Sequence, residues 1–202
     1  MASALDLFLK SRAEPATRVN AGTQAFRDGR LFIADPLDMA ETPITVATPS
    51  GVFPVFVYQR MWARYPSIPK KLTNAILAVE FSAQPPVRWE QVKAETDATG
   101  FGVLEFSAEF GSMSIMDGAT RARLLAKFDQ VKSAYDDFLS AYMEKDGQTV
   151  EVFDVPLGDG FNFIACNSGW SNGTYEAFLG RDASGEPVIL AVDFGIMDEY
   201  VA

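Results

Sequence analysis

Carboxylates are the side chains of this sequence whose type and spacing could do chemistry. Five of them fall at predicted strand ends or turns, namely Asp35, Glu80, Glu109, Asp117 and Asp193. Two or three carboxylates that converge can hold a hard cation such as Mg²⁺ or Ca²⁺, and a carboxylate can also serve as a general base. Glu109, Asp117 and Asp193 are therefore the candidate catalytic residues of a carboxylate-based, metal-dependent hydrolase.

Each of these five residues also has a structural interpretation. Asp35 precedes a proline turn, Asp117 stands where a helix N-cap belongs, and Asp193 can accept backbone N–H groups at a strand end. Glu80 lies inside an apolar run, so on a buried face it would need a partner such as Arg88. Glu109 simply faces water under this interpretation, as most charged side chains do.

Histidine is absent from the sequence, and the single cysteine is Cys166. Ser-His-Asp and Cys-His catalysis and a histidine- or thiolate-ligated zinc site are therefore excluded within the chain. No phosphate loop or dinucleotide fingerprint occurs, so the sequence predicts no cofactor. Cys166 follows Ile164 and Ala165 in a predicted strand and is expected to be a small buried hydrophobe. So few catalytic side chains favour a binding protein over an enzyme.

The charge of the chain is unevenly distributed. The net charge is −10, yet residues 1–71 hold nine basic and six acidic side chains, a balance of +3. Residues 72–202 hold eight basic and 21 acidic side chains, a balance of −13. Such an acidic surface repels phosphate backbones, which disfavours nucleic-acid binding, and it attracts a basic protein partner. The plain alternative is that the charge only keeps the protein in solution.

The ends and apolar runs of the chain bear on its location. The longest apolar stretches are far too short to span a bilayer, so no membrane segment is expected. The first ten residues lack a basic start and carry Asp6 within their apolar stretch, unlike a signal peptide. One cysteine allows no internal disulfide, and the cytoplasm is therefore the expected compartment.

The elements that must position these residues predict an α+β fold. Residues 3–12 are expected to form a short amphipathic helix, and residues 13–30 are polar and predicted to be an irregular arm. Residues 31–202 are expected to form a single domain, a mostly antiparallel sheet, sandwich-like or curved, with one long amphipathic helix packed on it. Strands followed by a helix and further strands favour this arrangement over a βαβ repeat.

Alternation and turn residues locate the strands. Strands are predicted at residues 31–33, 44–47, 51–60, 72–82, 101–106, 112–116, 149–155, 162–166, 174–179 and 188–194. Pro54 cannot donate to a ladder, so its strand is expected to lie at an edge or to start irregularly. Residues 88–96, around Trp89, are predicted to form one or two helical turns. The long helix is expected from about Ala119 to Met143, because apolar residues recur there at spacings of three and four.

A hairpin is predicted where the dipeptide Asn172-Gly173 separates two strands, since both residues tolerate positive φ. Trp170 and Tyr175 flank this dipeptide, and Asn172 lies within it. These three residues are the candidate binding residues, with Trp170 as an exposed aromatic for a partner. The alternative for Trp170 is that it folds over its own hairpin as part of the core.

Several segments together resemble the bacterial domain-of-unknown-function 4241 family. The similar segments are Ala34-Asp35-Pro36, Gly51–Val55, Pro86–Glu90, Glu109–Asp117, Ser168–Tyr175, Gly180–Gly185 and Val192–Phe194. The resemblance covers about residues 31–195 and implies no activity. Two departures matter: an aspartate of the family's middle stretch is Glu109 here, and the Gly-Asp pair of its last hairpin is Ser171-Asn172. If those acids form a site in relatives, this chain lacks part of it.

Two functions of different class follow from the sequence. The first is an acidic protein-binding module, such as an immunity or inhibitor protein that neutralises a basic enzyme, and its basis is the balance of −13. The second is the metal-dependent hydrolase built on Glu109, Asp117 and Asp193. The sequence favours the first.

Overall fold

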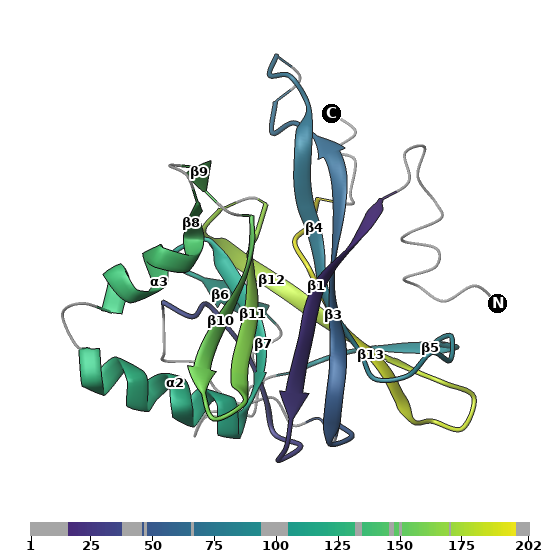
Figure 1. Cartoon of the computed structure of the whole chain (residues 1–202). Helices are drawn as coiled ribbons and strands as arrows, with labels where there is room; N and C mark the ends of the chain where they lie inside the picture. Colours follow the sequence, from purple (N-terminus) through teal and green to yellow (C-terminus); the bar gives the residue numbers. More distant parts are fainter. Residues whose placement is uncertain are drawn as a thin grey trace, which may run out of the picture.

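A computed structural model describes residues 16–37, 46, 48–65, 67–93, 105–131, 135–145, 148, 149, 151–169 and 171–196. The helix predicted over residues 3–12 and most of the strand predicted over 44–47 lie outside these residues. The described chain forms three layers: a large sheet, a smaller sheet and a pair of helices (Figure 1). All strand pairs in the described chain are antiparallel, which confirms the α+β prediction.

The large sheet contains seven strands. They are β1 (Thr17–Phe26), β3 (Gly51–Trp62), β4 (Lys71–Glu80), β13 (Pro187–Asp193), β12 (Gly173–Arg181) and β5 (Arg88–Gln91), in that order, with β6 (Glu105–Ala108) also paired to β12. The β3–β4 hairpin is the longest pair, and its end extends beyond the rest of the sheet at the top of Figure 1. The strand order means that residues far apart in sequence become neighbours across this sheet.

The small sheet lies between the large sheet and the helices. Its order is β10 (Val152–Gly158), β11 (Phe161–Asn167), β7 (Ser112–Asp117) and β2 (Leu31–Ala34). A two-stranded ribbon, β8 (Glu144–Lys145) and β9 (Gln148–Thr149), precedes β10. The turn at residues 158–160 joins β10 to β11, and all three residues have positive φ.

Strand alternation in the small sheet builds two separate cores. In β11, Ile164 and Cys166 face the large sheet, whereas Phe163 and Ala165 face the helices. Successive side chains of a strand point to opposite faces, so this run of four buried residues serves both cores. The small sheet is therefore covered on both faces, which holds its ends in place relative to the large sheet.

Two helices cover the outer face of the small sheet, where the sequence predicted one long helix. They are α2 (Gly118–Val131) and α3 (Tyr135–Met143), on either side of residues 132–134, which are not described. Leu124 is buried as expected, but Phe128 is 39% exposed. Both belong to the apolar stripe that the spacings of three and four predict, which consists of Leu124, Phe128, Val131, Tyr135, Phe138 and Tyr142. Leu139, which is outside that stripe, is fully buried instead. The stripe is wrong at Phe128, whereas Val131, Phe138 and Tyr142 pack, partly buried, against the same core as Leu124 and Leu139. Within the described residues, neither helix has the length and apolar character needed to cross a membrane.

Two predictions about the first strands are wrong. Residues 17–26, part of the predicted irregular arm, form β1 and pair with β3 along its length. They are polar because β1 is an edge strand with one solvent-exposed face. Gly22 lies at a bulge of this strand and has φ of +128°. β3 is consequently an internal strand. Pro54 is tolerated there because it pairs with Thr23 of β1, and the β3–β4 register begins one residue later, at Val55 and Val79.

Two further segments differ from their predictions for tertiary reasons. Residues 88–91 form β5 instead of helical turns, because the main chain of β12 pairs with them. The predicted hairpin at Asn172-Gly173 is also wrong. The strands on its two sides, β11 and β12, belong to different sheets, so this segment carries the chain from one sheet to the other.

Candidate functional site

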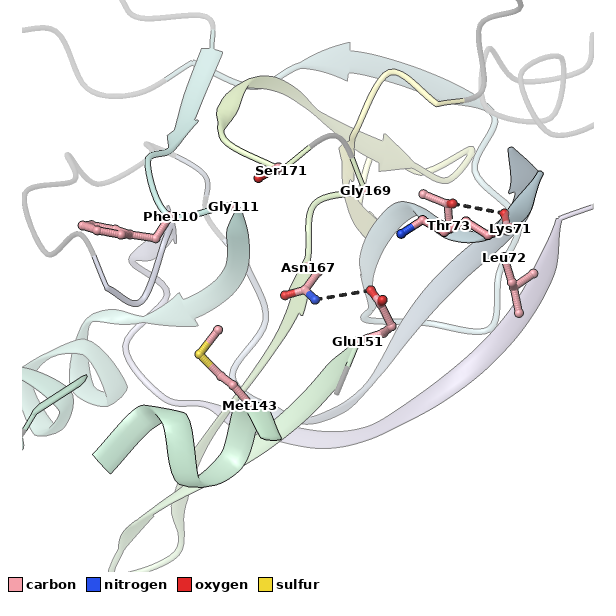
Figure 2. Close-up of a pocket in the computed structure, with 10 residues that line it drawn as sticks. All are labelled: Lys71, Leu72, Thr73, Phe110, Gly111, Met143, Glu151, Asn167, Gly169 and Ser171. Carbon is pink, nitrogen blue, oxygen red and sulfur yellow. Dashed lines mark hydrogen bonds between the residues drawn. The ribbon is translucent and has the colours of Figure 1, made fainter. Parts of the chain in front are cut away.

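The main candidate site is a cleft of about 320 Å³ at the end where the two sheets meet (Figure 2). Its lining comes from the start of β4, the β6–β7 turn, the end of α3, the entry to β10 and the passage from β11 to β12. The lining residues are Lys71, Leu72, Thr73, Phe110, Gly111, Met143, Glu151, Asn167, Gly169 and Ser171. The cleft thus draws on residues separated by up to 100 positions.

A buried aspartate holds the β6–β7 turn that forms one wall of the cleft. The carboxylate of Asp35 is fully buried and accepts hydrogen bonds from the backbone N–H groups of Phe110, at 2.8 Å, and Ser112, at 3.3 Å. It also accepts the Ser112 hydroxyl at 2.8 Å and the Leu37 N–H at 3.0 Å. These bonds compensate the burial of the charge. The backbone of Phe110 is therefore anchored, while its side chain is 65% exposed.

A second hydrogen-bond cluster fixes the passage between the two sheets. The backbone N–H of Ser168 donates to the carbonyl of Gly111 at 2.9 Å, and the Ser168 hydroxyl lies 3.1 Å from the same oxygen. The hydroxyl of Tyr175 donates toward the carbonyl of Ser171 at 2.8 Å. Burial raises the pKa of Tyr175, and its bond to Ser168 partly opposes that rise. These groups therefore position the backbone beside the cleft, and their hydrogen bonds are made within the protein.

The floor of the cleft is a close approach of three backbones. The side-chain amide of Asn74 donates to the carbonyl oxygens of Glu151, at 3.0 Å, and Asn167, at 2.9 Å, which ties β4 of the large sheet to β10 and β11. Gly169 packs on the same residue with φ of +70°, and a Cβ atom there would lie 2.3 Å from the carbonyl oxygen of Asn74. Only glycine fits this position without a shift of the backbone.

The cleft has a mixed lining with an acidic side. Lys71 and Leu72 stand at one side and Phe110 and Met143 at the other, and Glu151 lies between them, where its carboxylate accepts the amide of Asn167 at 3.3 Å (Figure 2). Exposed Glu109 and Glu144 directly adjoin the lining residues Phe110 and Met143. With one carboxylate, one ammonium group and three large apolar side chains, this lining suits the binding of an amphipathic group better than bond-breaking chemistry.

The structure does not bring the three candidate catalytic carboxylates together. Glu109 precedes β7 and Asp117 is its last residue, so the length of this strand alone separates them by about 17 Å. Asp193 ends β13 in the other sheet and accepts the N–H of Gly195 at 2.9 Å. Within the described chain, no three Asp, Glu, Cys or His side chains are grouped as a metal site would require.

Asp117 has the capping role that the sequence also allowed. It is fully buried, and its two oxygens accept the N–H groups of Thr120, at 2.7 Å, and Arg27, at 2.5 Å. The first bond is that of a helix N-cap to the third helical residue. Glu109 is exposed and accepts the hydroxyl of Ser107 at 2.9 Å.

Glu80 has a charged partner, but that partner is Arg18 of β1 and not Arg88. The two side chains form an ion pair at 2.5 Å, and the hydroxyl of Tyr58 also donates to Glu80 at 3.3 Å. Burial, and then the charge of Glu80, raise the pKa of Tyr58. The prediction missed Arg18 because the segment that carries it was not expected to form a strand.

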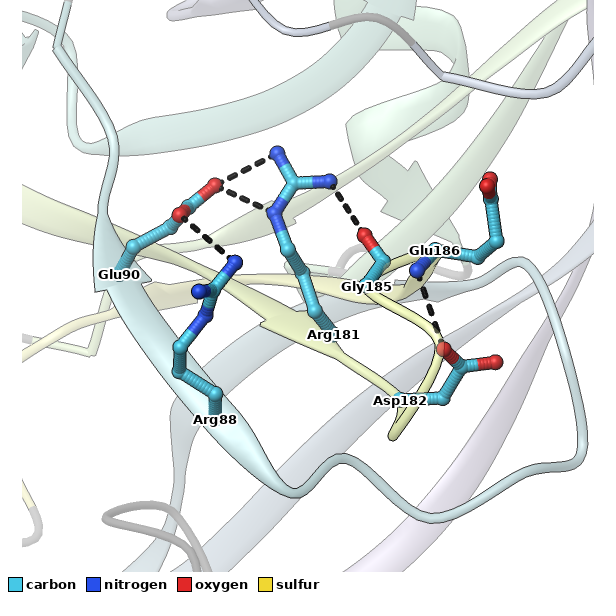
Figure 3. Close-up of polar contacts among 6 residues, drawn as sticks. All are labelled: Arg88, Glu90, Arg181, Asp182, Gly185 and Glu186. Carbon is cyan, nitrogen blue, oxygen red and sulfur yellow. Dashed lines mark hydrogen bonds and ion pairs between the residues drawn. The ribbon is translucent and has the colours of Figure 1, made fainter.

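Arg88 instead belongs to a network that fastens β5 to β12 (Figure 3). Arg181 donates from Nε to Glu90 at 2.7 Å and forms an ion pair with the same carboxylate at 2.6 Å. Nη1 of Arg181 donates to the carbonyl of Gly185 at 3.0 Å. Nη2 of Arg88 lies 3.9 Å from Oε2 of Glu90. Every charge in this network has a protein partner, so we assign it a structural role.

The three candidate binding residues differ in their exposure and in whether the structure describes them. Trp170 lies outside the described residues. Asn172 is exposed next to the cleft residue Ser171, whereas the ring of Tyr175 is buried against Phe194. Their role in binding stays a prediction.

Sequence reasoning did not single out the residues that line the cleft. Phe110, Glu151, Asn167 and Lys71 come from four separate segments, and none forms a motif with its sequence neighbours. The resemblance was the signal that could have pointed to part of the cleft, because Phe110 lies within the segment Glu109–Asp117 and Ser171 within Ser168–Tyr175. Their grouping depends on the passage of the chain between two sheets.

A comparison with protein families matches the part of the chain that contains most of the resemblance segments. A family model described as "Protein of unknown function (DUF4241)" matches residues 25–192. No curated protein and no solved structure gives a significant match. In the structure, three of the segments that carry the resemblance meet beside the cleft, at Asp35, Gly111 and Ser168. The match spans most of the chain, and the protein therefore belongs to the DUF4241 family.

Proposed function

We propose that this protein is an acidic protein-binding module that neutralises a basic partner, as an immunity or inhibitor protein does. The observation that carries the proposal is Phe110, a 65% exposed aromatic residue at the wall of the cleft. It stands beside Glu109 and shares the cleft with Glu151. An aromatic anchor next to carboxylates is the combination that a basic surface with an apolar pocket would bind.

The anchor is preorganised for binding. The backbone of Phe110 is bonded to the buried carboxylate of Asp35, so little backbone entropy is lost when the side chain is covered. Burial of a large apolar side chain contributes roughly 1.5–3 kcal/mol. Replacement of Phe110 by alanine should therefore weaken the complex by about 10- to 150-fold.

The charge of the chain supports the same partner class. Residues 72–202, which supply most of the cleft, carry a balance of −13. A field of one sign accelerates encounter with the opposite sign and loses strength as salt screens it. The partner is accordingly a basic protein, and action in the cytoplasm is part of the proposal because the lone cysteine is free and buried.

The structure offers less support for the hydrolase alternative. Both oxygens of Asp117 already accept backbone N–H groups, and Asp35 is equally saturated. A metal ligand or general base needs a lone pair that faces an open site. Of the acids near the cleft, Glu151 is the one that lines it.

The experiment is a capture of partners from the native host with the full chain as bait, followed by titration of the purified complex. We expect affinity to fall steeply with salt and to fall further in Phe110→Ala and in the double variant Glu109→Lys/Glu151→Lys. A complex whose affinity does not depend on salt, or that tolerates both variants, would contradict the proposal.

A matched control distinguishes the effect of the charges at the cleft from the effect of the net charge of the protein. Glu186→Lys makes the same charge change per site at an exposed residue near the far end of β12, roughly 26 Å from the cleft end of that strand. It should leave the dissociation rate nearly unchanged. If it weakens binding as much per charge as the cleft variants do, recognition is by the overall field and not by this site.

A further inference from the structure

The end of the β3–β4 hairpin carries an exposed apolar patch. Of the eight large apolar side chains that are exposed in the described chain, four lie between positions 61 and 72. They are Met61, Tyr65, Ile68 and Leu72. Single exposed apolar residues are ordinary, but half of them within twelve residues is a sign of an interaction surface.

The strand register orders this patch. Met61 and Leu72 are direct partners across the β3–β4 ladder, so their side chains lie next to each other on one face. At the turn, the N–H of Ile68 donates to the carbonyl of Tyr65 at 3.0 Å. The patch is therefore presented on a paired and hydrogen-bonded hairpin.

The same hairpin is basic in an acidic protein. Between residues 61 and 79 there is no Asp or Glu, whereas Arg64, Lys70 and Lys71 supply three positive charges. The guanidinium of Arg64 lies 5.8 Å from the ring centre of Tyr65, so charge and apolar surface are interleaved. We call residues 61–72 the basic bank.

The opposite side of the cleft is the complement of this surface. It presents the apolar Phe110 and Met143, which are preceded and followed in sequence by an exposed glutamate, Glu109 and Glu144 respectively, and the lining carboxylate of Glu151 lies beside them. We call these five residues the acidic bank. Lys71 and Leu72 of the basic bank line the same cleft as Phe110, Met143 and Glu151 of the acidic bank, so the two banks meet at this cleft (Figure 2).

We propose that two copies of this chain associate through this end, with the basic bank of each copy seated on the acidic bank of the other. A surface with two adjacent, complementary patches is self-complementary about a two-fold axis, which satisfies both patches at once. The dimer is closed, because each copy uses both of its banks in the single interface.

A second copy fits this end better than a polyanion does. Nucleic acid or an anionic bilayer would meet the basic bank but would be repelled by Glu109, Glu144 and Glu151 next to it. Only a partner that offers both signs in the same arrangement meets both banks. The proposal does not depend on the neutralisation of a basic partner, but the dimer would cover Phe110, so a basic partner and a second copy should compete.

A charge-swap experiment tests the pairing directly. Variant one is Lys70→Glu/Lys71→Glu and has two acidic banks; variant two is Glu109→Lys/Glu151→Lys and has two basic banks. Each variant alone should dimerise at least about 10-fold more weakly than the unchanged chain in sedimentation equilibrium at low salt. In a 1:1 mixture each bank meets its opposite charge again, so a mixed dimer should form.

Controls exclude unfolding and general charge effects. Thermal melts establish that both variants are folded, and Lys93→Glu and Glu186→Lys, at exposed sites outside the two banks, should dimerise like the unchanged chain. An unchanged chain that stays monomeric up to about 500 μM at low salt would overturn the proposal. So would folded variants whose mixture does not associate, or a monomer that sediments with phosphatidylserine vesicles. None of these outcomes requires the unknown basic partner, so the two proposals can fail separately.

Discussion

Replacement of Gly169 by alanine tests how the floor of the cleft is built. The residue has φ of +70°, and an added Cβ would lie 2.3 Å from the carbonyl oxygen of Asn74 and 3.0 Å from Cγ2 of Thr73. The nearest obstacle is backbone, so it cannot rotate away as a flexible side chain could. The floor must move, or the mutant must lose its native φ.

The expected cost has two parts. A left-handed conformation costs a non-glycine residue roughly 1–2 kcal/mol, partly offset by about 0.4–1 kcal/mol from the stiffer unfolded chain. Overpacking of a filled site adds about 1–3 kcal/mol. The free energy of unfolding of Gly169→Ala should therefore fall by about 1–4.5 kcal/mol in total.

A second glycine isolates the steric part. Gly185 has φ of +90°, yet an added Cβ there would meet nothing within 4 Å. Gly185→Ala should thus show only the conformational cost. The difference between the two variants, about 1–3 kcal/mol, is the clash with Asn74. It corresponds to a difference in melting temperature of roughly 2–12 °C for a domain of this size.

Urea denaturation followed by tryptophan fluorescence and circular dichroism gives both free energies from the same linear extrapolation. Equal losses of unfolding free energy in Gly169→Ala and Gly185→Ala would refute the steric argument, because the positive φ alone would then account for the whole loss in both variants. Gly169→Ala should also weaken partner binding, since Glu151 and Asn167 are both tied to Asn74 at this floor.

Four other outcomes can be measured on the purified chain. Asp35→Asn replaces an acceptor of three backbone N–H groups by a donor-bearing amide, and should lower the free energy of unfolding by about 3 kcal/mol in urea; a loss below about 0.5 kcal/mol would contradict the buried anchor. Burial raises the pKa of the Cys166 thiol, so a thiol reagent should label the protein only when it unfolds, and rapid labelling of native protein would disprove this. Burial raises the pKa of Tyr175 above its unfolded value; the stability it confers is complete below that value and is lost as pH rises through the folded pKa. Melts above about pH 9 should therefore fall more steeply in the unchanged chain than in Tyr175→Phe. Mg²⁺, Mn²⁺ or Ca²⁺ should leave the melting temperature unchanged, whereas a rise that saturates with any of them would support the hydrolase alternative.

Local sequence signals predicted the central strands well. β4, β7, β11, β12 and β13 lie within about two residues of their predicted bounds, since apolar alternation and turn residues mark a half- or fully buried strand. The turn at Asp182–Gly185 is also local, with the Asp182 carboxylate accepting the N–H groups of Ser184 and Glu186. The N-cap at Asp117 is another local feature, because the cap and the N–H group that donates to it are three residues apart.

The signals failed where pairing with a distant strand outweighed local preference. β1 is polar and contains a glycine bulge, and β5 has a weak strand pattern, yet each pairs with a strand far away in the sequence. The dipeptide Asn172-Gly173 has strong local hairpin chemistry, but the strands on its two sides belong to different sheets. Turn propensity describes a bend and does not choose the partner of the strands that leave it.

The amino-acid sequence by itself determined the limits of the chemistry and the charge: no imidazole, one thiol and a strongly acidic C-terminal two thirds. These are properties of composition, so no fold could change them. Only the tertiary structure decided which groups are available. It buried Asp35 and Asp117 among backbone donors, left Phe110 exposed, and brought Lys71 and Glu151 to one cleft. The reason is that burial and long-range pairing depend on the whole strand order, which no short segment encodes.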